Sequence, residues 1–337
     1  MSGDIYNNKK SENKLYYVSS IRVMAMFMIV LFHSLCFYAG TWGFVCAEQI
    51  TPIWKFMAPP IVNMGLTFFV LVSGFLYAFL YRKGYYRNTM MFIRKKATRL
   101  LIPFFVWGVY QIYCIPGLNK GWTDMLYSMS HLWFLMMLFE IFMIVTFISK
   151  LNIAERTTWK KDCIIFILTF VPYVISSKFL NAHSILCIET SFKYLPVFIV
   201  GLFLCKYRIP ERIRLEIAYA GILVGGAFLL LLSYDEVSLK HYIYTMVSII
   251  IGIFVFVILS QSNKNYRIVG YLDNYCMGIY LLNQIVIFYL LLNPDLRVFF
   301  MIHNYWGPFI IFAISFFVPL FITKIAKRTK WFSVILG

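Results

Sequence analysis

An arginine and a histidine lie in one apolar stretch near the N-terminus, and both residue types can take part in catalysis. Arg22 and His33 are separated by ten apolar or small residues. On an α-helix the eleven steps between them turn by about 1,100°, roughly 20° more than three full turns, so both side chains share one face. The same geometry puts them about 16 Å apart along the axis, too far to hold one small group together.

Their chemistry differs accordingly. An imidazole can take up a proton near neutral pH, so His33 is a candidate general base, and it is also a candidate nucleophile. An ionisable side chain inside an apolar helix is costly and therefore a candidate for function. The structural alternatives are an interfacial anchor for Arg22 and an interhelical hydrogen bond for His33.

The elements that must position these side chains are membrane helices. The 337 residues are 61% hydrophobic and only 13% charged, whereas soluble domains are about 45–50% apolar and about 25% charged. The net charge of +17 falls mostly in short gaps between apolar runs, so it indicates topology rather than a nucleic-acid partner.

Ten runs are long enough to cross a bilayer, and all should be helices because lipid offers the backbone no hydrogen-bond partners. Pro172 and Pro196 make two of them the weakest candidates. The fold class is thus all-α, a polytopic bundle with predicted spans at 18–39, 59–81, 100–116, 131–149, 163–180, 191–206, 216–233, 241–260, 273–292 and 304–323.

The basic residues give the orientation. With ten spans, the loops on the same side of the membrane as the N-terminus carry 24 of the 31 Lys and Arg residues, and the loops on the other side carry six. The positive-inside rule therefore places both termini in the cytoplasm. We expect one domain over 1–337, with cytoplasmic segments at 1–17 and 324–337, in a multi-pass protein of the cell membrane.

Other kinds of site are not indicated. The seven cysteines are scattered without a C-x-x-C pair, so neither a disulfide framework nor a metal site is expected. The signatures G-x-S-x-G, H-E-x-x-H and G-x-x-x-x-G-K-[ST] are absent from the sequence. Any chemistry should therefore take place within the helix bundle.

Five short motifs follow one another along nearly the whole chain, and together they resemble the acyltransferase-3 family of integral membrane acyltransferases. They are Arg22-x10-His33, Phe68-Phe69-Val70-Leu71-Val72-Ser73-Gly74-Phe75-Leu76, Arg99-Leu100-Leu101-Ile102-Pro103, His131-Leu132-Trp133-Phe134-Leu135 and Gly278-Ile279-Tyr280-Leu281-Leu282. The resemblance is to members that consist of the membrane domain alone, without the extracytoplasmic hydrolase-like domain that is fused to some relatives.

The resemblance implies transfer of an acyl group, usually acetyl from acetyl-CoA, to a hydroxyl of a cell-surface or lipid-linked carbohydrate, in a bacterial plasma membrane. Acyl-CoA would be a donor substrate, with no permanently bound cofactor. A hydroxyl is a poor nucleophile and needs a base. His33 would be that base, or would carry the acyl group covalently, and Arg22 would position the donor.

One position departs from the family. Many members carry a His after the paired leucines of the last motif, where this chain has Asn283. An amide donates and accepts hydrogen bonds but cannot titrate as a base. We therefore expect Asn283 to support the site through hydrogen bonds. Ser73 and Tyr280, which belong to the motifs, are expected to be further supporting residues.

The donor phosphates need cations, and the densest basic run holds Arg94, Lys95 and Arg99. Arginine binds phosphate in a bidentate manner and lysine acts as a point charge. The alternative for this run is plain topological signalling with attraction to anionic lipids. Arg99 is favoured for function because it belongs to a family motif.

His131 and Trp133 should face the acceptor at the opposite mouth, where Trp133 either stacks on a sugar ring or is an interfacial tryptophan. Glu140 needs a partner at its depth in the membrane, and we expect that partner to be Arg22 or His33, with simple helix contact as the alternative.

A second function class remains, an exporter or transporter of a polysaccharide or its precursor. A transporter typically shows internal symmetry and several charges along a path, so one Arg/His axis favours an enzyme.

Overall fold

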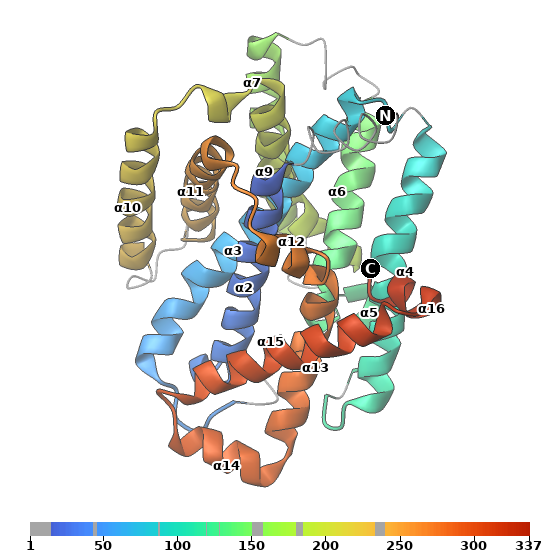
Figure 1. The fold of residues 1–337 in the computed structure, drawn as a ribbon, viewed down its shortest axis with the longest axis vertical. Helices are drawn as coiled ribbons and strands as arrows, with labels where there is room; N and C mark the ends of the chain where they lie inside the picture. The colour runs from blue at the N-terminus through green and yellow to red at the C-terminus, as the bar shows by residue number, and fades with distance from the viewer. Residues whose placement is uncertain are drawn as a thin grey trace, which may run out of the picture.

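The computed structural model describes residues 15–42, 46–86, 88–118, 120–127, 129–149, 158–179, 185–232 and 240–337. These residues form a helical bundle (Figure 1). Its elements are α2 (Tyr16–Ala39), α3 (Pro52–Arg82), α4 (Thr89–Cys114), α5 (Asp124–Tyr127), η1 (Ser130–Leu132), α6 (Trp133–Ser149), α7 (Trp159–Leu168), α8 (Phe170–Phe179), η2 (Ile185–Cys187), α9 (Ile188–Lys206), η3 (Ile209–Glu211), α10 (Leu215–Leu232), α11 (Lys240–Ser262), α12 (Arg267–Asp273), α13 (Cys276–Leu292), α14 (Pro294–Ile302), α15 (Gly307–Ala326) and α16 (Lys330–Ile335).

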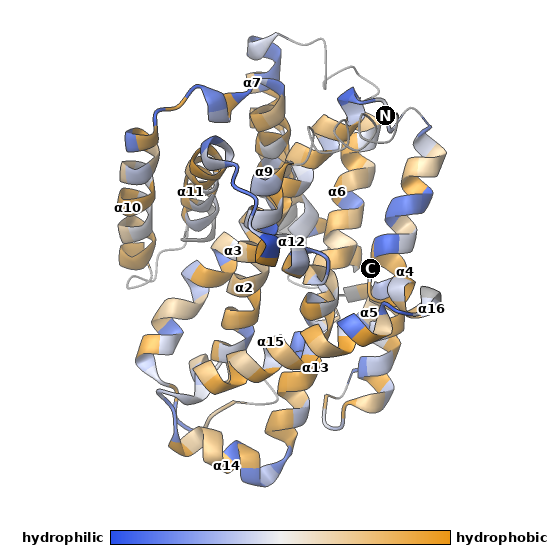
Figure 2. Cartoon of the chain, in the orientation of Figure 1, coloured by the Kyte–Doolittle hydropathy of each residue, from blue (hydrophilic) through white to orange (hydrophobic). Residues whose placement is uncertain are grey.

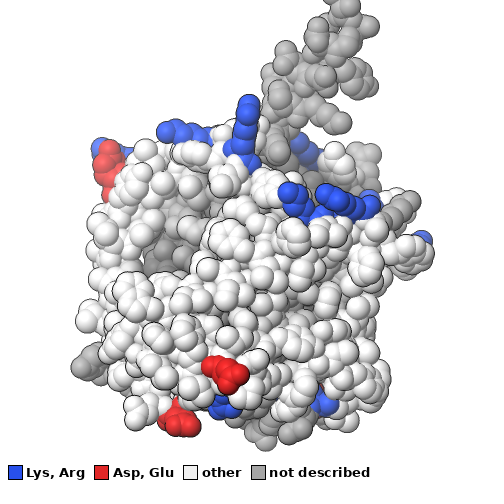
Figure 3. Space-filling view, turned by 60° about the horizontal axis from the view of Figure 1, so that its bottom comes forward, with Lys and Arg blue, Asp and Glu red and all other residues white. Residues whose placement is uncertain are grey.

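The chain is a multi-pass membrane protein. Within the described residues, seven helices are long and apolar enough to cross a bilayer, and eight if the bent pair α12 and α13 counts as one span. Figure 2 shows hydrophobic residues along most of the helices and hydrophilic ones in the connections and in part of α4. A largely uncharged surface with Lys and Arg gathered along one edge is visible in Figure 3.

Two of the ten predicted spans are not among these helices. The 100–116 run falls in α4, whose first half carries a dense group of basic residues, and the 163–180 run is split into α7 and α8, of ten residues each. The split lies at Thr169, three residues before Pro172, a residue that disrupts helical hydrogen bonding. The count of ten spans and the cytoplasmic termini stay predictions.

The helix that carries Arg22 and His33 lies at the centre of the bundle. α2 packs against α3, α13 and α15, and every residue of α2 from His33 to Ala39 is buried. α3 in turn packs closely on α9, because Gly74 and Gly201 let the two backbones touch. A Cβ on Gly74 would overlap the carbonyl oxygen of Phe198, and one on Gly201 would overlap that of Leu71. Small residues at helix crossings allow this approach.

The predicted span 273–292 is not a continuous helix. It is broken between Asp273 and Cys276, and α12 meets α13 at an angle of 65°. The break places Asp273 beside α2 and starts α13 about one turn before Tyr280 and about two turns before Asn283. Two helix ends therefore meet next to the face of α2 that carries Arg22.

Candidate active site

His33 is held by a hydrogen bond that sets its tautomer. Asn283 donates through Nδ2 to the carbonyl oxygens of Ile279 and Tyr280, at 3.0 and 2.6 Å. Its Oδ1 therefore faces His33 Nδ1, at 2.5 Å. Since Oδ1 can only accept, Nδ1 of His33 donates. In the neutral imidazole the lone pair is then on Nε2, which bonds to none of the described residues and is the atom left for chemistry.

A second imidazole lies beside the first. The ring centroids of His33 and His131 are 5.7 Å apart, and both side chains are buried. His131 Nε2 lies 3.1 Å from the carbonyl oxygen of Leu281 and donates to it, which leaves the lone pair on Nδ1. That Nδ1 is buried and has no hydrogen-bond partner among the described residues.

Residues of α13 hold the short segment that carries His131. The side-chain oxygen of Gln284 accepts from Ser130 Oγ at 2.9 Å and from the backbone N–H of His131 at 3.2 Å. The hydroxyl of Tyr280 donates to the backbone oxygen of His131. Asn283, Gln284 and Tyr280 are consecutive or one turn apart, so a single stretch of α13 positions both histidines.

Arg22 lies at the other end of α2 and is ion-paired. Its guanidinium bonds Asp273 at the end of α12, and Ser19 Oγ donates to the same carboxylate at 2.8 Å. The pair therefore lies at the break between α12 and α13. Arg22 is half-buried and still borders an open cavity.

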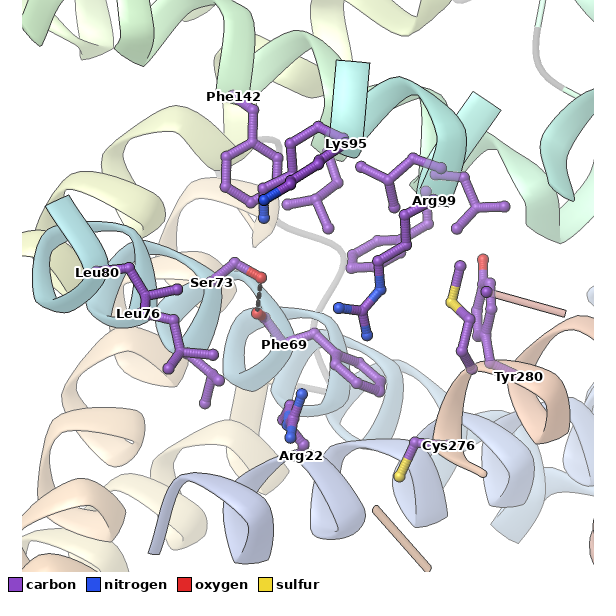
Figure 4. A pocket seen from close by; sticks show the side chains of 18 of the residues that line it. Arg22, Phe69, Ser73, Leu76, Leu80, Lys95, Arg99, Phe142, Cys276 and Tyr280 are labelled. Carbon is purple, nitrogen blue, oxygen red and sulfur yellow. Dashed lines mark hydrogen bonds between the residues drawn. The ribbon is translucent and has the colours of Figure 1, made fainter. Parts of the chain in front are cut away.

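This cavity has a volume of about 760 Å³ and is lined by α2, α3, α4, α6 and the break before α13 (Figure 4). Its described lining carries five cations and one carboxylate, namely Arg22, Lys95, Lys96, Arg99, Lys327 and Asp273. Burial and the nearby Arg99 guanidinium lower the pKa of Lys327 from its ordinary value. Such crowding of positive charge favours an anionic ligand, which would relieve the repulsion.

The basic run of α4 divides between two surfaces. The side chains of Lys95 and Arg99 point into the cavity in Figure 4, and Lys96 Nζ lies 3.8 Å from the ring centroid of Phe142. Arg94 does not line this cavity. It borders a shallower groove between α4 and α16, which Lys95 and Arg99 also line. The structure thus brings Lys95 and Arg99 together with Arg22 in the cavity, whereas Arg94 lines only the groove.

The cavity stops short of His33. Rings that include Phe134 and Tyr280 line the part of the cavity nearest to the histidines, here called its closed end because neither His33 nor His131 lines the cavity. The ring of Tyr280 contacts Phe134 at 5.8 Å on one side and His131 at 5.5 Å on the other, between centroids. One layer of aromatic rings therefore separates the cationic cavity from the two histidines.

A family model described as an acyltransferase domain matches residues 15–328. The chain belongs to the acyltransferase-3 family. No curated protein and no solved structure matches it significantly. The resemblance drawn from the five motifs is therefore confirmed over nearly the whole chain, and the protein is a membrane acyltransferase by family.

One expectation for this acyltransferase, the partner of Glu140, needs correction, and the place of Trp133 is reported beside it. Glu140 pairs with neither Arg22 nor His33, because its Oε2 accepts from Ser191 Oγ of α9 at 2.6 Å. α6 turns Glu140 towards α9, away from α2, so this carboxylate joins two helices. Trp133 is not in the histidine cluster either. Its ring contacts Phe134 and Tyr194, and a role with the acceptor stays a prediction.

Other motif residues lie near the expected places. Ser73 lines the cavity, where its hydroxyl donates to the carbonyl oxygen of Phe69 at 2.8 Å. Asn283 is the hydrogen-bonding support predicted from its amide. Sequence reasoning missed Asp273 and Lys327, although a carboxylate at the edge of a predicted span was a signal for the first. Nothing local indicated that Lys327 reaches the cavity.

Proposed function

We propose that this acyltransferase moves an acyl group, most simply acetyl from acetyl-CoA, to a hydroxyl of a cell-surface or lipid-linked carbohydrate. The proposal depends above all on the orientation of His33, because Asn283 holds Nδ1 and the Nε2 lone pair bonds to no residue in the described part of the chain. A base or nucleophile held in one tautomer is what acyl transfer to a hydroxyl requires.

The donor would bind with its phosphates among the cations of the cavity. Arg99 and Lys95 point into this space, and Lys96 and Lys327 also line it. Arg22 is already paired with Asp273, so its charge is partly neutralised. We assign to Arg22 the positioning of the donor's polar arm rather than binding of a full phosphate charge.

Two routes use the same atom. In the first, His33 Nε2 takes the hydroxyl proton, the oxygen attacks the thioester carbonyl, and the CoA thiolate leaves and accepts that proton. In the second, Nε2 attacks the thioester carbonyl and CoA leaves as a thiolate. The acceptor hydroxyl then attacks the acyl-imidazolium, its proton passes to the thiolate, and neutral His33 is restored. Both routes yield one ester and one free thiol. His131, with an unpartnered Nδ1 beside His33, would lie on the acceptor's side.

An exporter is less well supported. A polymer pathway would need polar groups along a continuous opening, whereas the cationic cavity ends at Phe134 and Tyr280 before it reaches His33. A closed end suits a ligand that enters and leaves by the same mouth. We also propose that the donor enters from the cytoplasm of a bacterial cell, the side to which the basic loops are assigned.

Labelled acetyl-CoA tests this function in membranes that hold the protein and candidate glycans. His33→Ala should abolish transfer at normal protein abundance, and His33→Gln should fail too, because an amide reproduces the bond to Asn283 but takes up no proton. If His33 only joined helices, Gln would substitute well and Ala would cost roughly 0.6–2 kcal/mol of stability. Transfer by His33→Gln near the wild-type level, per folded protein, would remove His33 from the mechanism.

A further inference from the structure

The closed end of the cationic cavity is built from apolar rings of three elements. Phe69 of α3, Phe134 of α6 and Tyr280 of α13 all line it. The centroids of Phe69 and Phe134 are 5.8 Å apart, and so are those of Phe134 and Tyr280. Phe134 is thus the middle ring of the wall. Lys96 marks the other, cationic end of the same space, because it lies over Phe142, about two turns further along α6.

The three rings are not held equally. The hydroxyl of Tyr280 donates to the backbone oxygen of His131, and this buried bond fixes its position. Among the described residues the ring of Phe134 contacts other rings and apolar groups, with no hydrogen bond to hold it in one rotamer. An acyl group that travels from the cavity towards His33 therefore needs Phe134 to turn aside, and the bulk of this ring limits the space that the rotation opens.

We propose that this closed end is the acyl-chain subsite, and that Phe134 limits the length of the acyl chain that the enzyme accepts. The inference rests on the proposed function, since it assumes an acyl-CoA in the cavity. With its phosphates at the cationic end, the donor directs its apolar end to the wall of rings. A short acyl group fits against Phe134, and a longer one collides with it.

Phe134→Ala should lengthen the subsite. The substitution removes roughly six carbon atoms from a buried ring, enough space for several methylene groups. Each methylene that finds an apolar place is worth about fourfold in affinity, which corresponds to about 0.8 kcal/mol. Butyryl-CoA and hexanoyl-CoA should then gain on acetyl-CoA by about an order of magnitude or more.

Phe142 supplies a matched control. It lies eight residues further along α6, about 12 Å away along the axis, and lines the same cavity. Its side chain is buried to a similar extent, 3% exposed against 6% for Phe134. Because Phe142 stacks under Lys96 at the cationic end, Phe142→Ala should weaken all CoA thioesters alike and leave their order unchanged.

The experiment measures equilibrium binding of acetyl-, butyryl-, hexanoyl- and octanoyl-CoA to the purified full chain in lipid nanodiscs. The readout is the ratio of each affinity to that for acetyl-CoA in wild type, Phe134→Ala and Phe142→Ala. A ratio that rises in Phe134→Ala alone supports the proposal. An unchanged ratio there, or an equal rise in both variants, overturns it.

Two further measurements keep the outcomes separate. Phe134→Leu removes less volume, so it should give a smaller shift in the same direction and replaces the alanine variant if that variant does not fold. A wild-type protein that binds no acyl-CoA would refute the proposed function itself. Wild-type binding with an unchanged chain-length ratio in both Phe134 variants would refute only the role of Phe134.

Discussion

At the scale of single residues, one amide decides which nitrogen of His33 is available. Asn283 stands where the family resemblance led us to expect a histidine, and its Oδ1 accepts from His33 Nδ1. A histidine could offer either a donor or an acceptor there, whereas this amide is fixed by its own bonds to α13. The substitution therefore keeps the supporting bond without a second titrating group.

Asn283→Leu should lower turnover and leave donor affinity unchanged. Without Oδ1 the imidazole loses the bond that selects its tautomer, and such a buried bond is worth about 1–3 kcal/mol. We expect turnover to fall by roughly 10–100-fold. Acetyl-transfer kinetics across a range of donor concentrations would show this, and a raised KM with unchanged kcat would contradict it.

Arg99→Ala should chiefly weaken donor binding. Arg99 points into the cavity among other cations, and a charged hydrogen bond to phosphate contributes about 1.5–3 kcal/mol. Arg99→Lys should recover only part of this because the bidentate geometry is lost. Arg94→Ala is the control, since Arg94 borders only the groove beside α16 and does not line the cavity. Titration with CoA measures the donor affinity of both variants. An equal loss of affinity in the two would mean that Arg99 serves only to set the membrane topology.

At the scale of elements, the crossing of α3 and α9 sets the wall of the site. Gly74 belongs to a family motif, and its lack of a side chain lets α3 touch the backbone of α9. α3 also contributes Phe69 and Ser73 to the cavity. A motif glycine therefore has a packing role that places two cavity residues.

Gly74→Ala should destabilise the protein by about 1–3 kcal/mol, the usual cost of overpacking, because a backbone oxygen cannot move aside easily. Gly226→Ala on α10 is the matched control, since nothing lies within 4 Å of its added Cβ and alanine favours helices. Thermal unfolding in detergent compares the two. Equal melting temperatures for both variants would contradict the close crossing.

At the scale of the whole molecule, charge and apolar surface set how the bundle lies in the membrane. Figure 3 shows basic residues along one edge of a largely uncharged surface. The cavity takes several of its cations from the α4 run that dominates the basic loops. The orientation and the donor binding that we propose would therefore depend on the same basic segment.

We expect the 82–99 connection in the cytoplasm and the 117–130 connection outside. A cysteine at Asn88 should then resist an impermeant maleimide in intact cells, and one at Thr123 should react. The background needs only Cys46, Cys114 and Cys163 replaced, because the other four cysteines are buried. Labelling at Asn88 but not at Thr123 would reverse the orientation.

The sequence by itself determined the class of the protein. Lipid forces each long apolar run into a helix, so most membrane helices, the shared face of Arg22 and His33, and the family motifs could be read directly. These features are local, or depend on the solvent rather than on a partner. Asn283 could also be assigned a supporting role, because its amide has only hydrogen bonds to offer.

Only the tertiary structure decided which side chains meet. Arg22 and Asp273 are 251 residues apart in the chain, and His33 and Asn283 are 250 apart, so neither pairing has a local signal. The break before α13 places Asp273 beside Arg22. The rotation of α6 about its axis turns Glu140 towards α9, where it accepts a hydrogen bond from Ser191. Bends and rotations of packed helices depend on side-chain fit across the whole bundle, which no single stretch of sequence contains.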